Sequence, residues 1–251
     1  MSAWNVLLLV LAGAGCGLVN TVAGGGSLIL FPALLVTGLA PLSANVTNSV
    51  ATWPGYVGGV GAFRTEIHER RHLLPWLLGA TLVGSTLGCA LLLLTPSAAF
   101  DVIVPVLVLA ATVMTALQPW VRRHLRERTG SDHRPSVAAI LAVGAATVYG
   151  GYFGGGLGVI VLGVLGLTIN DSVRNLTATK SVISLVDATV SVIVFGLFGP
   201  VDWASVLIAA PTCLIGGYLG GAIARRLDER VLRACVVGLG LVVSVVLFVT
   251  L

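Results

Sequence analysis

The chain has 251 residues, of which 57% are hydrophobic and 10% charged, and its formal net charge is +4. A soluble domain carries about a quarter charged residues, so this composition excludes a soluble enzyme, a nucleic-acid-binding protein and a disordered chain. A mean hydropathy of +1.03 indicates a protein whose solvent is membrane lipid. The four cysteines lie in apolar stretches without metal-ligand spacing, and we interpret them as packing residues.

The first charged residue is Arg64, because residues 1–63 contain no Asp, Glu, Lys or Arg. As one helix, this stretch would be about 95 Å long, roughly three bilayer thicknesses, so it must fold back on itself. The uncharged run 135–170 is also too long for one crossing, and it is rich in glycine at its middle. The N-terminus lacks the basic residues of a signal peptide, so we expect no cleaved targeting segment.

The uncharged runs predict an all-α polytopic membrane protein, because they are continuous and do not alternate as the strands of a membrane barrel do. About ten segments are expected, at 4–22, 26–39, 44–62, 73–94, 102–121, 136–152, 156–169, 176–198, 203–224 and 231–250. Segments 26–39 and 156–169 would span about 21 Å of a hydrocarbon core of about 30 Å. We expect them to be half-helices or parts of re-entrant hairpins, interrupted by glycine.

An internal repeat relates the two halves of the chain. The glycine triplet at 24–26 recurs at 154–156, a spacing of 130 residues. The same spacing aligns two pairs of polar residues, Asn45 with Asn175 and Thr47 with Thr177. We therefore expect a first transmembrane repeat at 1–121, a basic cytoplasmic linker at 122–135 and a second repeat at 136–251.

The positions of the arginines predict how the repeats are oriented. Arginine is concentrated in the loops 64–72, 122–134 and 225–233, whereas loops 95–101 and 199–202 contain no Lys or Arg. By the positive-inside rule the arginine loops are cytoplasmic. All three lie on one side only if each long glycine-centred run is a hairpin. Each half then has five segments, which makes the repeats inverted, as in many secondary transporters, and places both termini outside.

Two short signatures resemble those of a known family. The run NTVAGGGS at 20–27, followed by Pro32 and by ANVTNS at 44–49, resembles the N-terminal signature of the TauE/SafE sulfite-exporter family. The runs GGGLG at 154–158 and NLTATKS at 175–181 resemble its second-half signature. This resemblance covers essentially the whole chain. It implies a multi-pass permease of the bacterial inner membrane for small sulfur-containing or organic anions, such as sulfite or sulfonates.

The glycine triplets are the first candidates for substrate binding: Gly24, Gly25, Gly26, Gly154, Gly155 and Gly156. Glycine lets backbone N–H groups approach a ligand, and helices that begin at Ser27 and Leu157 would direct positive N-terminal ends at an anion. The alternative is that these glycines only allow close packing of helices.

Uncharged polar residues beside the glycine triplets and around the starts of the third segment of each half are the second candidates, and we expect them to replace the hydration shell of an anion. They are Asn20, Ser27, Asn45, Thr47, Asn48, Asn175, Thr177 and Ser184. The alternative is ordinary helix capping or hydroxyl contacts between helices.

Lys180 and Asp187 are charged residues inside an apolar segment, where a charge is costly and suggests function. Lys180 is the single lysine of the chain and could bind an anion, or extend to the cytoplasmic interface. Asp187 lies seven residues later on the same helix face. It could pair with Lys180 through Ser184 or water, carry a coupling proton, or bond to a neighbouring helix.

These features favour a secondary transporter, and in particular an exporter, of small anions. The alternatives are a channel-like or uptake permease for another small anion, an intramembrane enzyme, or a membrane subunit without transport activity. No P-loop, haem-ligand or metal-ligand spacing occurs, so we expect no cofactor and no metal. The expected partners are a small anion and membrane lipid but no nucleic acid, and the sequence leaves a homodimer open.

Overall fold

The computed structural model describes residues 2–22, 25–124, 135–223 and 229–250, and within these ranges the chain forms α-helices and no β-strand. The helices are α1 (Ala3–Val22), α2 (Ser27–Val36), α3 (Pro41–Ala62), α4 (Arg64–Glu69), α5 (Leu74–Leu94), α6 (Ser97–His124), α7 (Val137–Tyr152), α8 (Leu157–Thr168), α9 (Val173–Phe198), α10 (Trp203–Ile223) and α11 (Glu229–Thr250). The predicted all-α class is confirmed.

Each of the ten predicted segments overlaps one helix, but some of the predicted ends were wrong. Helix α6 begins at Ser97 and includes Asp101, and α9 begins at Val173, where Ser172 Oγ accepts a hydrogen bond from the backbone N–H of Asn175. The predicted segments were ended at the nearest charged residue. A charged side chain near a helix end can reach water, however, so the helix can continue past it. The short helix α4 was expected to be a loop.

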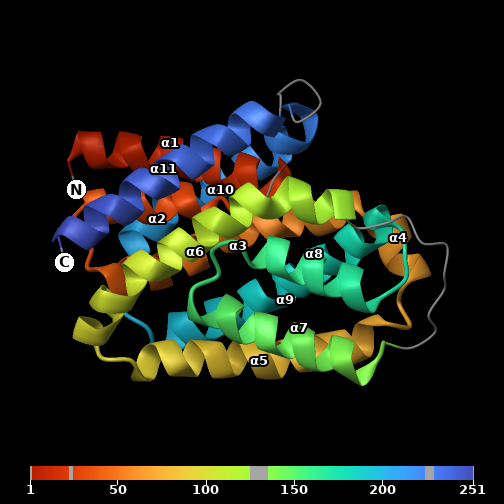
Figure 1. Ribbon diagram of the computed structural model, residues 1–251. Helices are drawn as coiled ribbons and strands as arrows, with labels where there is room; N and C mark the ends of the chain where they lie inside the picture. The colour runs from red at the N-terminus through yellow and green to blue at the C-terminus, as the bar shows by residue number, and fades with distance from the viewer. Residues whose placement is uncertain (1, 23–24, 125–134, 224–228, 251) are drawn as a thin grey trace.

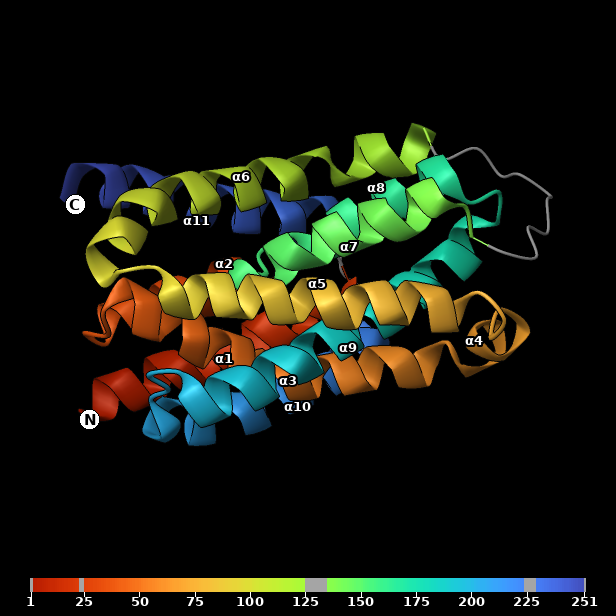
Figure 2. The ribbon, with the colours of Figure 1, turned by 90° about the horizontal axis from the view of Figure 1, so that it is seen from below.

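The long helices run lengthwise along the molecule, which has two distinct ends (Figures 1 and 2). Both chain termini lie at one end, called here the terminal end, together with the connections α5–α6 and α9–α10. Helix α4, whose neighbourhood carries Arg64, Arg70 and Arg71, lies at the opposite end, called here the arginine end.

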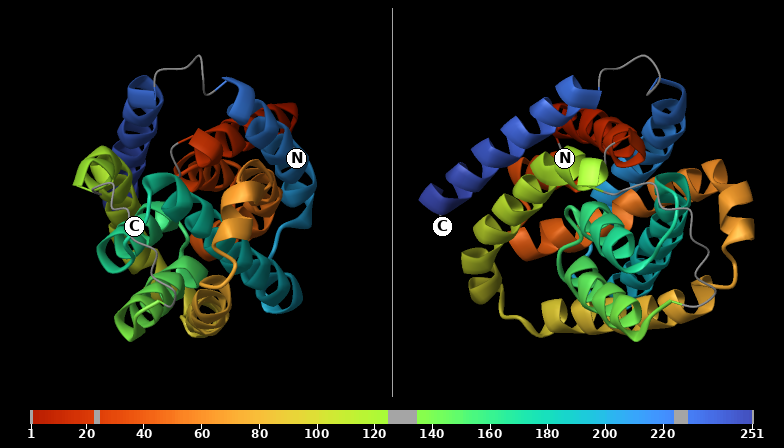
Figure 3. Two further views of the ribbon diagram at one scale, coloured as in Figure 1. Left: turned by 90° about the vertical axis from the view of Figure 1, so that its right-hand side faces the viewer. Right: turned by 45° about the vertical axis from the view of Figure 1, so that its right-hand side comes forward.

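The helix contacts that join the two halves of the chain occur in matching pairs. Helix α1 packs on α10, and α7 packs on α5; α10 contacts α3, and α5 contacts α9. Helices α3 and α9 contact each other at the centre of the bundle, and α6 and α11 pair at its side (Figure 3). The α3–α9 pair is therefore one of several contacts between the two halves of the chain, and it lies at the centre of the bundle.

The two glycine reversals lie against the middle of α6. A Cβ atom on Gly25 would lie 2.9 Å from Thr115 Oγ1, and one on Gly155 would lie 3.0 Å from Ala111 Cβ. Ala111 and Thr115 are one helical turn apart near the midpoint of this 28-residue helix. The α1–α2 and α7–α8 hairpins therefore both reverse beside the middle of α6.

Glycine also sets the closest helix packing. A Cβ atom on Gly17 of α1 would overlap the carbonyl oxygen of Cys213 on α10. One on Gly88 of α5 would overlap the carbonyl oxygen of Val148 on α7. Both helix pairs thus approach backbone to backbone, as small residues permit in membranes.

Buried apolar side chains form two clusters. The larger draws on most helices of the bundle and includes Phe31, Phe100 and Phe195. The smaller surrounds the α7–α8 hairpin and includes Leu77, Leu165 and Ile183.

The outer helix faces are apolar, with exposed residues such as Leu87 on α5 and Leu207 on α10. Within the described residues, five helices are long and apolar enough to cross a membrane, and α2, α7 and α8 are among the shorter apolar helices.

Candidate functional site

A polar cavity lies where α3 and α9 meet, beside the α7–α8 reversal and the first residue of α2. Its lining is mostly uncharged and polar. The lining residues are Ser27, Asn48, Ser49, Thr52, Tyr56, Gly150, Phe153, Gly154, Asp187, Ala188 and Ser191.

Helix geometry explains why these side chains converge. Asn48, Thr52 and Tyr56 are spaced four residues apart on α3 and so share one face. Asp187 and Ser191 have the same spacing on α9. Trp53 Nε1 donates a 2.9 Å hydrogen bond to Thr189 Oγ1, which fixes α3 against α9 beside the cavity.

The cavity volume is about 20 Å³. A single water molecule needs about 10–15 Å³ on the same measure. The cavity therefore has room for one water-sized particle, and a larger ligand requires the surrounding helices to move apart.

Asp187 is the acidic residue of the cavity, and its side chain is buried at 4% exposure. Its Oδ1 accepts a 2.6 Å hydrogen bond from Ser85 Oγ on α5. A Cβ atom on Gly150 of α7 would lie 2.6 Å from the same oxygen, so glycine is needed there for α7 to pack beside the carboxyl group. The alternative that Asp187 bonds to a neighbouring helix is therefore realised through Ser85.

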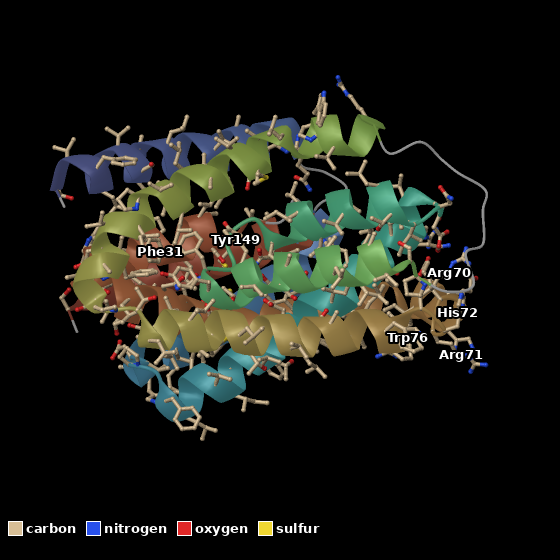
Figure 4. All side chains as sticks on the ribbon, turned by 60° about the horizontal axis from the view of Figure 1, so that its bottom comes forward. Phe31, Arg70, Arg71, His72, Trp76 and Tyr149 are labelled. Carbon is tan, nitrogen blue, oxygen red and sulfur yellow. The ribbon has the colours of Figure 1, made fainter. Side chains whose placement is uncertain are left out.

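The Phe153 ring lines the cavity and packs against two further aromatic rings. The Phe153 ring meets the Phe31 ring edge to face at 5.8 Å between centroids, and Tyr149 at 6.4 Å. Tyr149 Oη donates a 2.6 Å hydrogen bond to the carbonyl oxygen of Gly155. Figure 4 shows Phe31 and Tyr149 near each other in the interior, far from Arg70 at the arginine end. The rings thus connect α2, α7 and the second reversal.

Four of the predicted site residues line this cavity: Ser27, Asn48, Gly154 and Asp187. Both Gly154 and Gly156 have positive φ, at 76° and 75°. Residues with side chains rarely adopt this conformation, so the second triplet is needed for the turn itself.

Other predicted residues stabilise the turns around the cavity. Asn20 Oδ1 accepts a 2.9 Å hydrogen bond from the backbone N–H of Gly26, so both groups are engaged in the first reversal. Gly25, at φ 95°, belongs to the same turn. Gly24 falls outside the described residues.

Asn45 and Thr47 connect the start of α3 to the second half. Asn45 Nδ2 donates a 3.0 Å hydrogen bond to the carbonyl oxygen of Tyr152, at the end of α7. Thr47 Oγ1 accepts one of 3.0 Å from the backbone N–H of Asp202. The structure does not place either of them in the cavity lining.

The equivalent residues of the second half lie in a separate polar cluster at the start of α9. Asn175 Nδ2 donates a 2.8 Å hydrogen bond to Asp171 Oδ1, and Arg70 Nη2 donates one of 2.9 Å to the same oxygen. Thr177 Oγ1 donates to the carbonyl oxygen of Val173 within α9. The repeat therefore aligns residues in sequence that do not meet in space.

Lys180 and Ser184 lie on α9 between this cluster and the cavity. Lys180 is half-buried, and its Nζ lies 3.5 Å from where a Cβ atom on Gly158 would be, at the first turn of α8. Ser184 is buried at 5% exposure. Neither residue is part of the cavity lining.

Sequence reasoning missed Ser85, Tyr56, Gly150, Phe153 and Ser191 as site residues. The helical spacing from Asp187 to Ser191, and from Asn48 to Tyr56, could have indicated two of them. Nothing in the sequence pairs Ser85 with a residue 102 positions away.

Residues 9–247 match the family described as Sulfite exporter TauE/SafE. The chain belongs to the TauE/SafE family. Among its relatives, the "Probable membrane transporter protein YfcA" of Escherichia coli K12 is 25% identical over 234 residues, covering 91% of this chain and 84% of the relative. A "Probable membrane transporter protein" of Haemophilus influenzae is 24% identical, covering 92% and 89% of the two chains, and "ORF9" of a Sinorhizobium species is 27% identical, covering 94% and 87%. No solved structure matches the chain.

This TauE/SafE member is therefore a multi-pass membrane protein similar over most of its length to probable membrane transporters. The predicted family is confirmed.

Proposed function

We propose that this TauE/SafE protein is a secondary transporter of the bacterial inner membrane that exports small anions such as sulfite or sulfonates. The supporting observation is the polar cavity at the α3–α9 contact, midway along the bundle, in a chain of a sulfite-exporter family. A buried polar site between two halves of a membrane bundle is the usual position of a transport site.

The proposed mechanism is alternating access between two inverted repeats of five helices. The exchange of helix partners supports it, because α1 packs on α10 of the other half just as α7 packs on α5. Both connections without Lys or Arg lie at the terminal end, opposite α4. Movement of the group α1, α3 and α10 against the group α5, α7 and α9, whose contact includes the cavity, would open it first to one end and then to the other.

The anion is proposed to bind near the start of α2, where Ser27 lines the cavity. The N-terminal end of a helix carries about half a positive charge, which favours an anion. Lys180, half-buried beside the first turn of α8, supplies a full positive charge on the arginine side of the cavity. Movement of α8 and α9 would bring this ammonium group closer to the substrate.

Asp187 is proposed as the coupling group. It is the one carboxyl group among the lining residues of the cavity. The described lining contains no Lys, Arg or His that would neutralise it. An isolated buried carboxylate is costly, and it would also repel an anion. A cation bound to Asp187 would neutralise this negative charge and so favour binding of an anion in the same cavity.

Flux into and out of proteoliposomes tests the proposal. Purified protein is reconstituted, and sulfite, a small sulfonate and a carboxylate of similar size are offered with protein-free liposomes as background. We expect saturable flux of at least one sulfur-containing anion and counterflow by an excess of the same anion. Linear, non-saturating flux would favour a channel, and no flux of any anion under any ion gradient would contradict the proposal.

A further inference from the structure

The cavity contains a hydrogen-bond acceptor without a donor. Asn48 is buried at 2% exposure, and its Oδ1 has no hydrogen-bond partner among the described residues. The same side chain lines the cavity together with Asp187. A buried acceptor without a donor destabilises the folded protein, so a ligand that offers positive charge to this oxygen is favoured.

The last turn of α7 also borders the cavity. Gly150, in the last turn of α7, lines the cavity, and the helix ends at Tyr152. The C-terminal end of a helix carries about half a negative charge on its last carbonyl groups. In transporters, such ends of broken helices coordinate Na⁺.

The charge of the lining favours a monovalent cation. Asp187 contributes one negative charge, and the other described lining residues are hydroxyl, amide, glycine or apolar residues. One monovalent cation neutralises this carboxylate, whereas a divalent cation would leave an excess positive charge in a medium of low dielectric constant, which is costly.

The size of the cavity agrees with a small ion. A volume of about 20 Å³ accommodates one particle of about the size of water. Na⁺ meets this limit, and a sulfite ion, with four heavy atoms, exceeds it. The cavity as it stands therefore fits the coupling ion better than the anion.

We propose that this cavity binds Na⁺ through the Asp187 carboxylate, Asn48 Oδ1 and main-chain oxygen at the end of α7. Ser85 donates to Oδ1 of Asp187, and a carboxylate retains further lone pairs for an ion. A proton bound to Asp187 would be donated to a single acceptor. A hard cation such as Na⁺ is coordinated by several oxygens at once, so it can interact with both Asp187 and Asn48 Oδ1. The inference rests on the proposed function, because it names the ion whose gradient drives the anion.

Thermal unfolding of the purified protein measures Na⁺ binding without any transport. The melting temperature is recorded in NaCl, KCl and choline chloride at constant ionic strength and neutral pH. We expect Na⁺ to raise the melting temperature in a saturable way, because a ligand that binds only the folded state stabilises it. K⁺ and choline should have little effect.

Three variants locate the site. Asn48→Ala and Asp187→Asn should raise the Na⁺ concentration for half-maximal stabilisation at least about tenfold, whereas Asn48→Asp, which keeps an oxygen, should retain the Na⁺ response. The matched control is Asn45→Ala. Asn45 is on the same helix, is buried at 1% exposure and also has an unpartnered Oδ1, but it is not a lining residue of the cavity. This variant should lower the melting temperature yet keep the Na⁺ shift.

Equal melting temperatures in all three salts would overturn the proposal, and so would an unchanged Na⁺ response in Asn48→Ala. If lowering the pH in the absence of Na⁺ reproduces the full stabilisation, the proton is the ligand and the sodium site is wrong. If Asn48→Ala does not fold, the Na⁺ responses of Asp187→Asn and Asn48→Asp still show whether Na⁺ binds in this cavity. Anion flux that is independent of a Na⁺ gradient would contradict this inference but not the proposed transport function. The absence of any anion flux would contradict the proposed transport function but not Na⁺ binding.

Discussion

Arg70 and Asp171, 101 residues apart in sequence, form an ion pair between the α4–α5 connection and the start of α9. Arg70 Nε lies 2.7 Å from Asp171 Oδ2, and Nη2 donates a 2.9 Å hydrogen bond to Oδ1. The Asp171 side chain is 6% exposed. A second pair joins Glu66 of α4 to Arg174 of α9 at 2.5 Å. The two halves of the chain are thus held together at the arginine end by charge.

Arg70→Ala should lower the free energy of unfolding by about 1–3 kcal/mol, because it leaves a buried carboxylate without its strongest partner. The double exchange Arg70→Asp with Asp171→Arg should recover part of this loss. Thermal and denaturant unfolding in detergent measure both.

Arg71→Ala is the control for this pair, since Arg71 is the next residue in the chain and is exposed. An exposed charge contributes about 0–1 kcal/mol, so this variant should be nearly neutral. Equal losses in Arg70→Ala and Arg71→Ala would show that the Arg70–Asp171 pair has no special role.

The topology predicts that Ser97 and Glu69 lie on opposite sides of the membrane. Both are exposed, Ser97 at the start of α6 and Glu69 at the end of α4. Cysteines introduced at the two positions, in a chain with the exposed Cys235 replaced by serine, should react with an impermeant reagent from opposite sides. By the positive-inside rule, position 97 should be labelled in intact cells. Labelling of both positions from the same side would refute the inverted arrangement.

Lys180→Gln should abolish anion binding while leaving the folded state nearly intact. Lys180→Arg should also bind poorly, because a planar guanidinium does not replace a compact ammonium group. Binding to the purified protein and saturable flux are the measurements. Arg174→Gln, six residues earlier on α9 and exposed, is the charge-matched control and should bind normally. Unchanged binding in Lys180→Gln would assign Lys180 to the membrane interface.

Asp187→Asn should retain anion counterflow but lose accumulation driven by an ion gradient. The amide keeps the shape of the side chain and can still accept the Ser85 hydrogen bond, but it carries no charge. Counterflow without a gradient is compared with accumulation under Na⁺ and proton gradients. If both activities survive, Asp187 is not the coupling group. A uniport driven by the membrane potential would then be the better explanation, at about 2.3 kcal/mol per charge per 100 mV.

Gly88→Ala should destabilise the protein by about 1–3 kcal/mol, the usual cost of overpacking. The added methyl group would overlap the carbonyl oxygen of Val148 and approach Tyr152 N at 2.9 Å. Gly79, on the same helix, has no atom within 4 Å of its Cβ position. Gly79→Ala should therefore be neutral or slightly stabilising, since alanine is the better helix former. Similar melting temperatures for the two variants would contradict the close α5–α7 contact.

The sequence determined which parts of the chain form helices and to which family the protein belongs. Apolar runs longer than a bilayer is thick, such as 1–63, must reverse, and glycine at 24–26 and 154–156 indicated where. The sequence also identified Asp187 as a candidate functional residue, because a charge inside an apolar segment is costly and therefore suggests function.

The tertiary structure alone decided which polar residues share a site. Asn45 and Asn175 match in the repeat, yet Asn45 contacts the end of α7 and Asn175 contacts Asp171 at the arginine end. Asp187 meets Ser85 of α5 where Gly150 lets α7 pack closely beside Asp187 and Gly151 lets it pack closely beside Ser85. Local periodicity fixes which face of a helix a residue occupies. Which other helix covers that face depends on packing between segments about a hundred residues apart, and no local pattern records it.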